Sequence, residues 1–240
     1  MRKLLIVLAA VLATAGCATK NTEQRFMDEV GSLSKEEIGS RGQELYAKKR
    51  WEEARKYFSF LSDSFPNDPL GRQAALRVAD TFYSMRDTDS LAEAQLRYRD
   101  FSNRFPSDPG RPYALLMLGK CSYSQRRGPL RDLAPVREAA DSLRQVVQLF
   151  PDSTYTQEAK ELLQKCLEDL GQHEYQVAKY YASIGAWRGA KQRLDHLRAN
   201  YPDTDAARQA GPLIEQVELK FNPPASPAPT RASAPNPSKH

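Results

Sequence analysis

The side chains in this chain that most often carry chemistry are three histidines and three cysteines. His173, His196 and His240 do not stand at the spacing of metal ligands, and the chain has no glycine-rich phosphate loop. A histidine in such a context is more often a surface or helix-packing residue. Neighbouring carboxylates such as Glu52 and Glu53 are typical of a solvated helix face. We therefore expect a protein that is not an enzyme and that holds no metal and no cofactor.

Cys17 carries the clearest chemical signal, which is lipidation. Two cations, Arg2 and Lys3, precede an apolar run at residues 4–13, and small residues at 14–16 lead to the cysteine. The run is too short to span a bilayer and is typical of a secretory signal peptide. Its Ala-Gly-Cys ending resembles a bacterial lipobox, in which the cysteine is acylated, commonly with palmitate, and becomes the new N-terminus. The alternative is a plain secretory signal followed by an incidental cysteine.

The residue after Cys17 is Ala18 rather than the aspartate associated with inner-membrane retention. We therefore expect the protein at the cell outer membrane, lipid-anchored on its periplasmic face. Removal of Arg2 and Lys3 with the signal peptide leaves 33 basic and 30 acidic residues. A chain so nearly balanced in charge has no nucleic-acid signature, and we expect no nucleic acid among its partners.

Two further cysteines, Cys121 and Cys166, occupy equivalent positions in successive segments, each 15 residues after an aromatic-proline pair. An oxidising periplasm would permit a disulfide between them. Buried helical thiols that act as small apolar residues are the favoured interpretation. Neighbouring helix axes lie about 8–10 Å apart, which often leaves such a pair too distant to bridge.

These residues are set in a helical pattern that occurs four times. Each copy has an alanine on an apolar face of helical period, and a proline follows that alanine by 12 residues. The copies open near Trp51, Leu91, Val136 and Trp187 and close at Phe65-Pro66, Phe105-Pro106, Phe150-Pro151 and Tyr201-Pro202. The pattern is that of the second helix in a tetratricopeptide repeat (TPR), which proline ends. It predicts an all-α, TPR-like α-solenoid of about nine helices, a fold that usually binds other polypeptides.

The expected organisation has four parts. Residues 1–16 are the signal peptide, 17–33 a lipidated tether with an irregular lead-in, 34–221 the solenoid, and 222–240 a disordered proline-rich tail. The first full unit, Lys35–Asp68, has the 34-residue TPR period.

Within the solenoid, small residues and helix caps predict local detail. We expect Gly42 to let the second helix of the first unit approach closely. Asp68-Pro69 and Asp108-Pro109 should each cap and open the next helix. Residues 125–132 expand one turn into a basic loop. We expect separate helices at 154–170 and from 171 onward, and one last helix at 205–221.

Three tyrosines are predicted to line the concave groove of the N-terminal units. Tyr46, Tyr83 and Tyr123 all fall at the twelfth position of a unit, on its first helix. The ninth positions, which flank them, hold Gln43, Asp80 and Lys120. Tyrosine offers apolar area with a polar tip, which suits the binding of extended, aromatic-rich peptides. The alternative is that these rings only pack between repeats.

Part of the chain resembles the BamD family of TPR lipoproteins in the outer-membrane β-barrel assembly (BAM) complex. The most specific block is His173–Tyr181, continued through Gly185-Ala186-Trp187 to Tyr201–Thr204. The Trp51-x-x-Ala54 start, Arg131-Asp132 before Ala139, and the lipobox agree in order and spacing. The resemblance covers roughly residues 17 to 221.

The resemblance implies a function in outer membrane protein assembly and protein insertion into the membrane. C-terminal repeats would dock onto the periplasmic POTRA domains of the barrel-forming subunit, with Arg193 at the family's arginine position. N-terminal repeats would help receive unfolded outer-membrane proteins, and other BAM lipoproteins are further candidate partners. The family commonly has one more helix after Phe221, which Pro223 and Pro224 stop here.

Two other interpretations remain open. The first is a TPR adaptor lipoprotein that recruits a periplasmic protease or cell-wall hydrolase. The second is the cell-division TPR protein associated with the Tol-Pal system. That protein usually carries an N-terminal coiled coil and no lipid, whereas this chain has no heptad run before Lys35.

Overall fold

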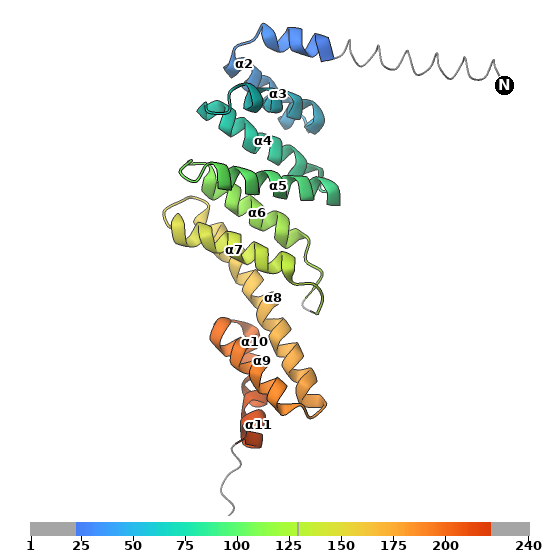
Figure 1. Ribbon diagram of the computed structural model, residues 1–240, viewed down its shortest axis with the longest axis vertical. Coiled ribbons are helices and arrows are strands. Elements are labelled where there is room, and N and C mark those ends of the chain that lie inside the picture. The colour runs from blue at the N-terminus through green and yellow to red at the C-terminus, as the bar shows by residue number, and fades with distance from the viewer. Residues whose placement is uncertain (1–22, 129, 222–240) are drawn as a thin grey trace, which may run out of the picture. The chain divides into compact units, whose positions relative to one another are not determined.

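The computed structural model describes residues 23–128 and 130–221, so Cys17 and the tail at 222–240 lie outside the described residues. A helical segment at residues 23–31 comes first (Figure 1). It is followed by α2 (Lys35–Ala47), α3 (Trp51–Ser64), α4 (Pro69–Met85), α5 (Thr88–Arg104), α6 (Arg111–Ser124), α7 (Ala134–Leu149), α8 (Thr156–Ser183), α9 (Trp187–Asn200), α10 (Asp205–Gln209) and α11 (Gly211–Phe221). No strand occurs in these ranges. The predicted all-α, TPR-like fold is confirmed.

The helices group into two compact units. Unit 1 runs to Arg126 and resumes over Ala134–Leu163, and unit 2 comprises Arg127–Leu133 and the chain from Gln164 onward. Helix α8 begins in unit 1 and ends in unit 2. No helix of the described ranges is both long and apolar enough to cross a lipid bilayer.

In unit 1 each helix from α2 to α7 packs against the next one along the chain. The aromatic-proline pairs lie where the pattern predicts, since α3 ends just before Phe65 and α5 just before Phe105. Each helix buries one face, and the buried side chains form one cluster from the lead-in to α4 and a second from α4 to α6. The core of the first hairpin includes Ile38, Phe58 and Leu61, all nearly fully buried.

Small residues set the distance between the two helices of a hairpin. A Cβ atom on Gly42 would stand 2.7 Å from the Phe58 ring, and one on Gly119 would stand 2.7 Å from Leu143. Such distances are far inside van der Waals contact, so these glycines permit a packing that no larger residue would allow. The predicted role of Gly42 is confirmed.

Helix caps follow the sequence at one of the two predicted places. The Asp68 carboxylate accepts a 2.8 Å hydrogen bond from the Leu70 N–H at the start of α4, with Pro69 in the first turn. The same prediction for Asp108 was wrong. Its carboxylate accepts a 2.7 Å hydrogen bond from Gly110, but α6 begins only at Arg111. Asp108 therefore orders the loop before the helix instead of capping it.

The helix boundaries differ from the expectation in three places. The lead-in is helical rather than irregular at residues 23–31, where Val30 is 2% exposed and belongs to the core. The predicted break near residue 171 is absent, because Gly171 lies inside α8. A Cβ there would stand 2.9 Å from the Thr204 hydroxyl, so Gly171 serves close packing and not helix termination.

The third difference is at the end of unit 2. The single helix expected at 205–221 is divided into α10 and α11, and Thr204 caps the first of them by accepting a hydrogen bond from the Ala207 N–H. Pro212, in the first turn of α11, has no N–H to continue the preceding helix. The helical lead-in and the division of 205–221 each add a helix to the described ranges, whereas the continuous α8 removes one.

Cys121 and Cys166 are both buried and free of disulfides. Burial raises the pKa of the Cys121 thiol to about 12, so it stays protonated and behaves as a small apolar residue. The favoured interpretation of these two residues is confirmed.

Two glycines of α2 give a matched test of the packing. Gly42→Ala should lower the free energy of unfolding by about 1–2 kcal/mol, because the added methyl group must displace the Phe58 ring. Gly39→Ala is the control, since its Cβ would meet Leu61 at an ordinary 3.6 Å. That substitution should be neutral or stabilising by up to about 1 kcal/mol through helix propensity. Urea unfolding measures both, and equal effects would contradict the account of the close approach.

Candidate functional site

Unit 1 contains a groove of about 470 Å³ between α4, α6 and the residue that precedes α8. We call it the α4–α6 groove. It is lined by Pro69, Arg72, Gln73, Leu76, Arg77, Asp80, Asp108, Pro109, Gly110, Tyr113 and Tyr155. The lining combines apolar and aromatic surface with a few charged groups, which is the usual character of a binding pocket.

The charged groups of the α4–α6 groove neutralise one another. Arg72 Nε lies 2.6 Å from Asp108 Oδ2, and both side chains are largely buried. Arg77 Nη1 lies 3.0 Å from Asp80 Oδ2. Each guanidinium is therefore committed to a carboxylate of the wall, and the groove presents little net charge to an occupant.

Asp80 joins three helices through one oxygen atom. The hydroxyls of Tyr98, on α5, and Tyr113, on α6, both donate to Asp80 Oδ1, at 2.6 Å and 2.7 Å. Asp80 is 3% exposed and Tyr98 is fully buried. Burial, and secondly the negative charge of Asp80, raise the pKa of both tyrosine hydroxyls far above the usual value. Both hydroxyls therefore stay protonated and keep donating across the physiological pH range.

This hydrogen bonding fixes an aromatic wall. The Tyr113 ring lies 6.2 Å from that of Tyr98 in an edge-to-face arrangement and 5.3 Å from that of Tyr155, centroid to centroid. Tyr113 and Tyr155 face the groove, so its aromatic surface is held in place before any ligand arrives.

The predicted tyrosine column lies elsewhere on the first helices. Tyr46 shares a 2.9 Å hydrogen bond with Ser84, and its ring lies 4.8 Å from Trp51. Arg86 lies over the ring of Tyr83, and Arg126 over that of Tyr123. All three tyrosines are half-buried. The α4–α6 groove is lined by Tyr113 and Tyr155 rather than by any of them.

The predicted ninth-position residues have three different surroundings. Gln43 is exposed and lines a second hollow, of about 440 Å³, beside α2, α3 and α4. Asp80 lines the α4–α6 groove but is turned toward the two tyrosines. Lys120 forms a 2.5 Å ion pair with Glu158.

Among the groove residues, Asp80 was predicted from the sequence, whereas Gln73, Arg77 and Tyr113, which lie one to two turns before the ninth positions of α4 and α6, were missed. Gln73, Arg77 and Asp80 share one face of α4 at helical spacing, and Tyr113 stands at the position of α6 that corresponds to Gln73. The second position of each unit, which holds Gln73 in α4 and Tyr113 in α6, was therefore a usable sequence signal for groove residues, as was the ninth position. Tyr155 has no such signal, because it precedes its helix.

Arg193, in unit 2, is partly engaged within the chain. Its Nη1 lies 3.1 Å from Glu174 Oε2, and the Glu174 side chain is only 6% exposed. His196 Nε2 lies 3.9 Å from the other oxygen of the same carboxylate. The Arg193 side chain itself is 41% exposed, which leaves part of it open to solvent.

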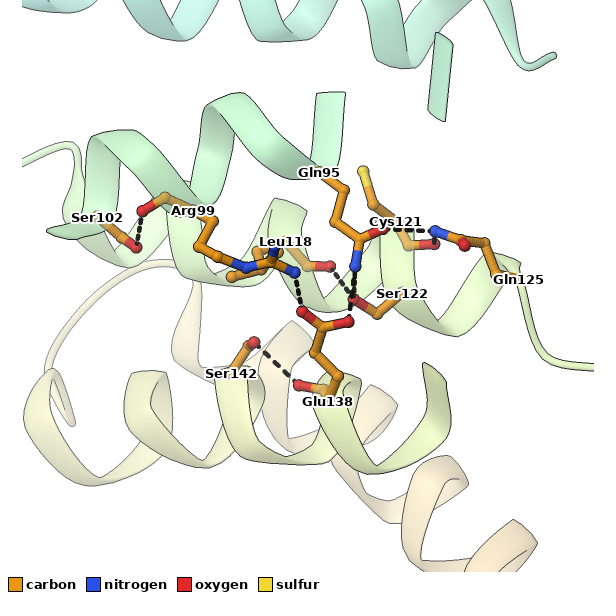
Figure 2. A network of polar contacts seen from close by, with 9 residues as sticks. All are labelled: Gln95, Arg99, Ser102, Leu118, Cys121, Ser122, Gln125, Glu138 and Ser142. Carbon is orange, nitrogen blue, oxygen red and sulfur yellow. Dashed lines mark hydrogen bonds and ion pairs between the residues drawn. The ribbon is translucent and has the colours of Figure 1, made fainter. Parts of the chain in front are cut away.

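A second polar network in unit 1 reaches Gln125, the residue that follows α6. Figure 2 shows Glu138, on α7, directed at Gln95 and Arg99 of α5. The Gln95 amide donates to Glu138 at 2.6 Å and to Ser122 at 3.1 Å, and Gln125 donates to Gln95 at 2.6 Å. Helices α5, α6 and α7 and the C-cap residue of α6 are thereby joined.

Comparison with known proteins identifies the family. The YfiO family, described as an outer membrane lipoprotein family, matches residues 32–229. The chain belongs to this family. The match extends over all the helices from α2 to α11, so both units are family features.

Curated relatives carry the name outer membrane protein assembly factor BamD. That of Neisseria gonorrhoeae is 27% identical over 96% of this chain and 89% of the relative. That of Haemophilus influenzae is 25% identical over 92% of this chain and 86% of the relative. A solved structure, a thermophilic TPR protein of Thermus thermophilus, aligns with a TM-score of 0.41 at 18% identity, over 78% of this chain and all of that one.

The Asp80 hydrogen bonds predict a pH dependence. Tyr113→Phe should be about 1 kcal/mol less stable than the wild type below pH ~10, because one hydrogen bond to the carboxylate is lost. The pKa of Tyr113 is raised in the folded protein, so the wild type loses stability as the pH rises above the unfolded value of ~10. The variant lacks that titration. The stability gap in urea unfolding should therefore narrow above pH ~10, and a gap that widened there would contradict the assignment.

Proposed function

We propose that this protein is a non-enzymatic assembly factor for outer membrane proteins, held on the periplasmic face of the outer membrane by acyl chains on Cys17. The observation that carries the proposal is the family match over residues 32–229, whose curated relatives are named outer membrane protein assembly factors. The signal-peptide pattern and the Ala-Gly-Cys sequence that ends at Cys17 support the lipid anchor.

In this proposal the α4–α6 groove receives segments of unfolded outer-membrane proteins. Its arginines are paired with wall carboxylates, so it favours neutral or aromatic side chains over strongly charged ones. Tyr113 and Tyr155 offer ring faces, and Leu76 adds apolar surface. Strands of membrane β-barrels alternate apolar and polar residues and end in aromatic girdles, so an extended barrel strand fits these requirements. Tyr46 of α2, Tyr83 of α4 and Tyr123 of α6 remain proposed contributors to peptide binding on the first helices of the hairpins.

Unit 2 is proposed to dock onto the POTRA domains of the barrel-forming subunit. Arg193 keeps part of its guanidinium available while Glu174 orients it. Exposed apolar side chains accompany it in the same unit, with Tyr180 62% and Ile184 58% exposed. Arginine and aromatic residues are enriched at protein interfaces, so unit 2 has residue types that suit a docking surface.

Photo-crosslinking tests the groove. A benzoylphenylalanine at Gln73, which is exposed and lines the α4–α6 groove, should crosslink to a peptide of a C-terminal barrel strand. The same group at the exposed Gln145 of α7 is the control and should not crosslink. The substitution Tyr155→Ala should weaken peptide binding by roughly tenfold, because the contact with one ring face, which contributes about 1–1.5 kcal/mol, is lost.

The tyrosine column is tested separately. The triple variant with Tyr46, Tyr83 and Tyr123 changed to Phe keeps each ring and removes only the hydroxyls. Weaker peptide binding by this variant would assign those hydroxyls to the binding site. If neither the triple variant nor Tyr155→Ala changes peptide binding in a folded protein, the proposed peptide site on the first helices is wrong.

A test of docking through Arg193 needs a variant in which Glu174 is not left as a buried carboxylate without a partner. Arg193→Gln alone should lower stability by about 1–2 kcal/mol, since the exposed fraction of the arginine reduces the usual cost of breaking a buried pair. Arg193→Gln combined with Glu174→Gln should restore the folding stability and still weaken binding to isolated POTRA domains by at least about tenfold. Glu174→Gln alone is the control and should keep the binding. Calorimetry that finds wild-type affinity for the double variant would exclude Arg193 from the interface.

A further inference from the structure

The end of unit 1 that is nearest to Cys17 in the chain carries an open hollow of about 770 Å³. It lies between the helical segment 23–31 and α3. Its lining comprises Glu23, Arg25, Phe26, Met27, Glu29, Glu53, Lys56, Tyr57 and Phe60. We call it the N-terminal hollow.

The N-terminal hollow presents apolar surface that the core does not cover. Met27 is 48% exposed, whereas Val30, one turn later, is 2% exposed and packs inward. The Phe26 ring lies 5.1 Å from that of Tyr57 and 6.3 Å from that of Phe60, in edge-to-face arrangements. Phe26 and Phe60 are both only half-buried. A rigid aromatic base with an exposed methionine beside it is therefore available to an apolar partner.

The charges around the hollow leave two cations without an ion pair to any described residue. Of the carboxylates in the lining, Glu29 accepts a 2.8 Å hydrogen bond from the Tyr57 hydroxyl, Glu53 is bound by Arg50, and Glu23 is exposed without an ion pair to a described residue. Arg25 and Lys56 are exposed, and neither has an ion pair within the part of the chain that the structure describes. Long cationic side chains beside apolar surface place their stems on the apolar phase and their charges at its polar boundary.

Covalent geometry limits how far this hollow can be from the lipid. Five residues, 18–22, separate Cys17 from Glu23. Six residue steps span at most about 22 Å even when fully extended. A bilayer that holds acyl chains on Cys17 therefore lies within that distance of the helical segment 23–31.

We propose that the N-terminal hollow is a membrane contact, in which Met27 and the edges of Phe26 and Phe60 enter the phospholipid interface. Arg25 and Lys56 lie at the lipid phosphates. The inference rests on the proposed lipidation of Cys17. Acyl chains and a protein surface with apolar and cationic groups are two separate membrane signals, and together they hold a peripheral protein more firmly and in one orientation.

Fluorescence quenching in vesicles tests this contact. The full-length lipidated protein with Met27→Cys is labelled with the environment-sensitive dye NBD and reconstituted into vesicles of phosphatidylethanolamine and phosphatidylglycerol. Cys121 and Cys166 are buried and should not react, which the unsubstituted parent checks. The dye should shift its emission to the blue and be quenched by phospholipids spin-labelled at shallow depth.

The matched control is Leu149→Cys on α7, since Leu149 is similarly exposed at 55% and also belongs to unit 1. Its dye should be unshifted and unquenched. Changing Arg25 and Lys56 to Glu should reduce the quenching at position 27 at least twofold while the protein stays on the vesicles.

Three outcomes would overturn the inference, and they are distinguishable. If the protein floats with the vesicles but the dye at position 27 behaves like that at 149, the anchor holds and the contact is wrong. If the dye shifts but spin-labelled phospholipids do not quench it, the protein's own acyl chain or tether fills the hollow instead. If the protein does not float and its Cys17 is unmodified in mass spectrometry, the lipid anchor fails and the contact fails with it.

Discussion

The structure depends on the close approach of two antiparallel helices through one small residue. Ala54, Ala94, Ala139 and Ala190 each lie near the start of the second helix of a hairpin, and each is 0% exposed. Where the facing helix also has a glycine, as at Gly42 and Gly119, large side chains of the second helix pack against its backbone. With this packing, the first helices of successive hairpins in unit 1 lie on one face of the unit. The α4–α6 groove lies on that face.

Polar interactions then fix the positions of individual side chains, which helix packing alone does not determine. The Asp80 carboxylate holds two tyrosines from two other helices. Glu138 of α7 accepts hydrogen bonds from Gln95 and Arg99 of α5, and Gln95 in turn donates to Ser122 of α6 (Figure 2). Each network is buried or half-buried, so its groups are costly to leave unpaired. The Asp80 contacts order the aromatic wall of the groove before a ligand binds. Binding therefore carries only a small free-energy cost for ordering these side chains.

The sequence predicts the fold well because its signals are local. The alanine-to-proline register, the aromatic-proline helix ends and the Asp68 cap all concern residues within a few turns of one another, and all are confirmed. The helical lead-in also had a local signal, since Phe26, Val30 and Leu33 recur at helical spacing.

The candidate site was harder to predict because its contacts are not local. Asp80 is bonded to Tyr98, 18 residues away, and to Tyr113, 33 residues away. No spacing rule distinguishes a buried carboxylate of this kind from an exposed groove residue. The same applies to Gly171, which was expected to separate two helices but instead lets Thr204 pack against a continuous one. Arg193 likewise has a partner, Glu174, 19 residues away, so its family position alone did not reveal an internal ion pair.

We propose that this protein acts in outer membrane protein assembly as a scaffold within a larger complex. The most direct measurement is affinity purification of the full-length, lipidated protein from detergent-solubilised membranes, with partners identified and quantified by mass spectrometry. We expect recovery of a barrel-forming subunit with POTRA domains in near-stoichiometric amount, and its loss when Arg193 and Glu174 are both changed to Gln. Stoichiometric recovery of a periplasmic protease or cell-wall hydrolase, with no barrel-forming subunit, would contradict this proposal.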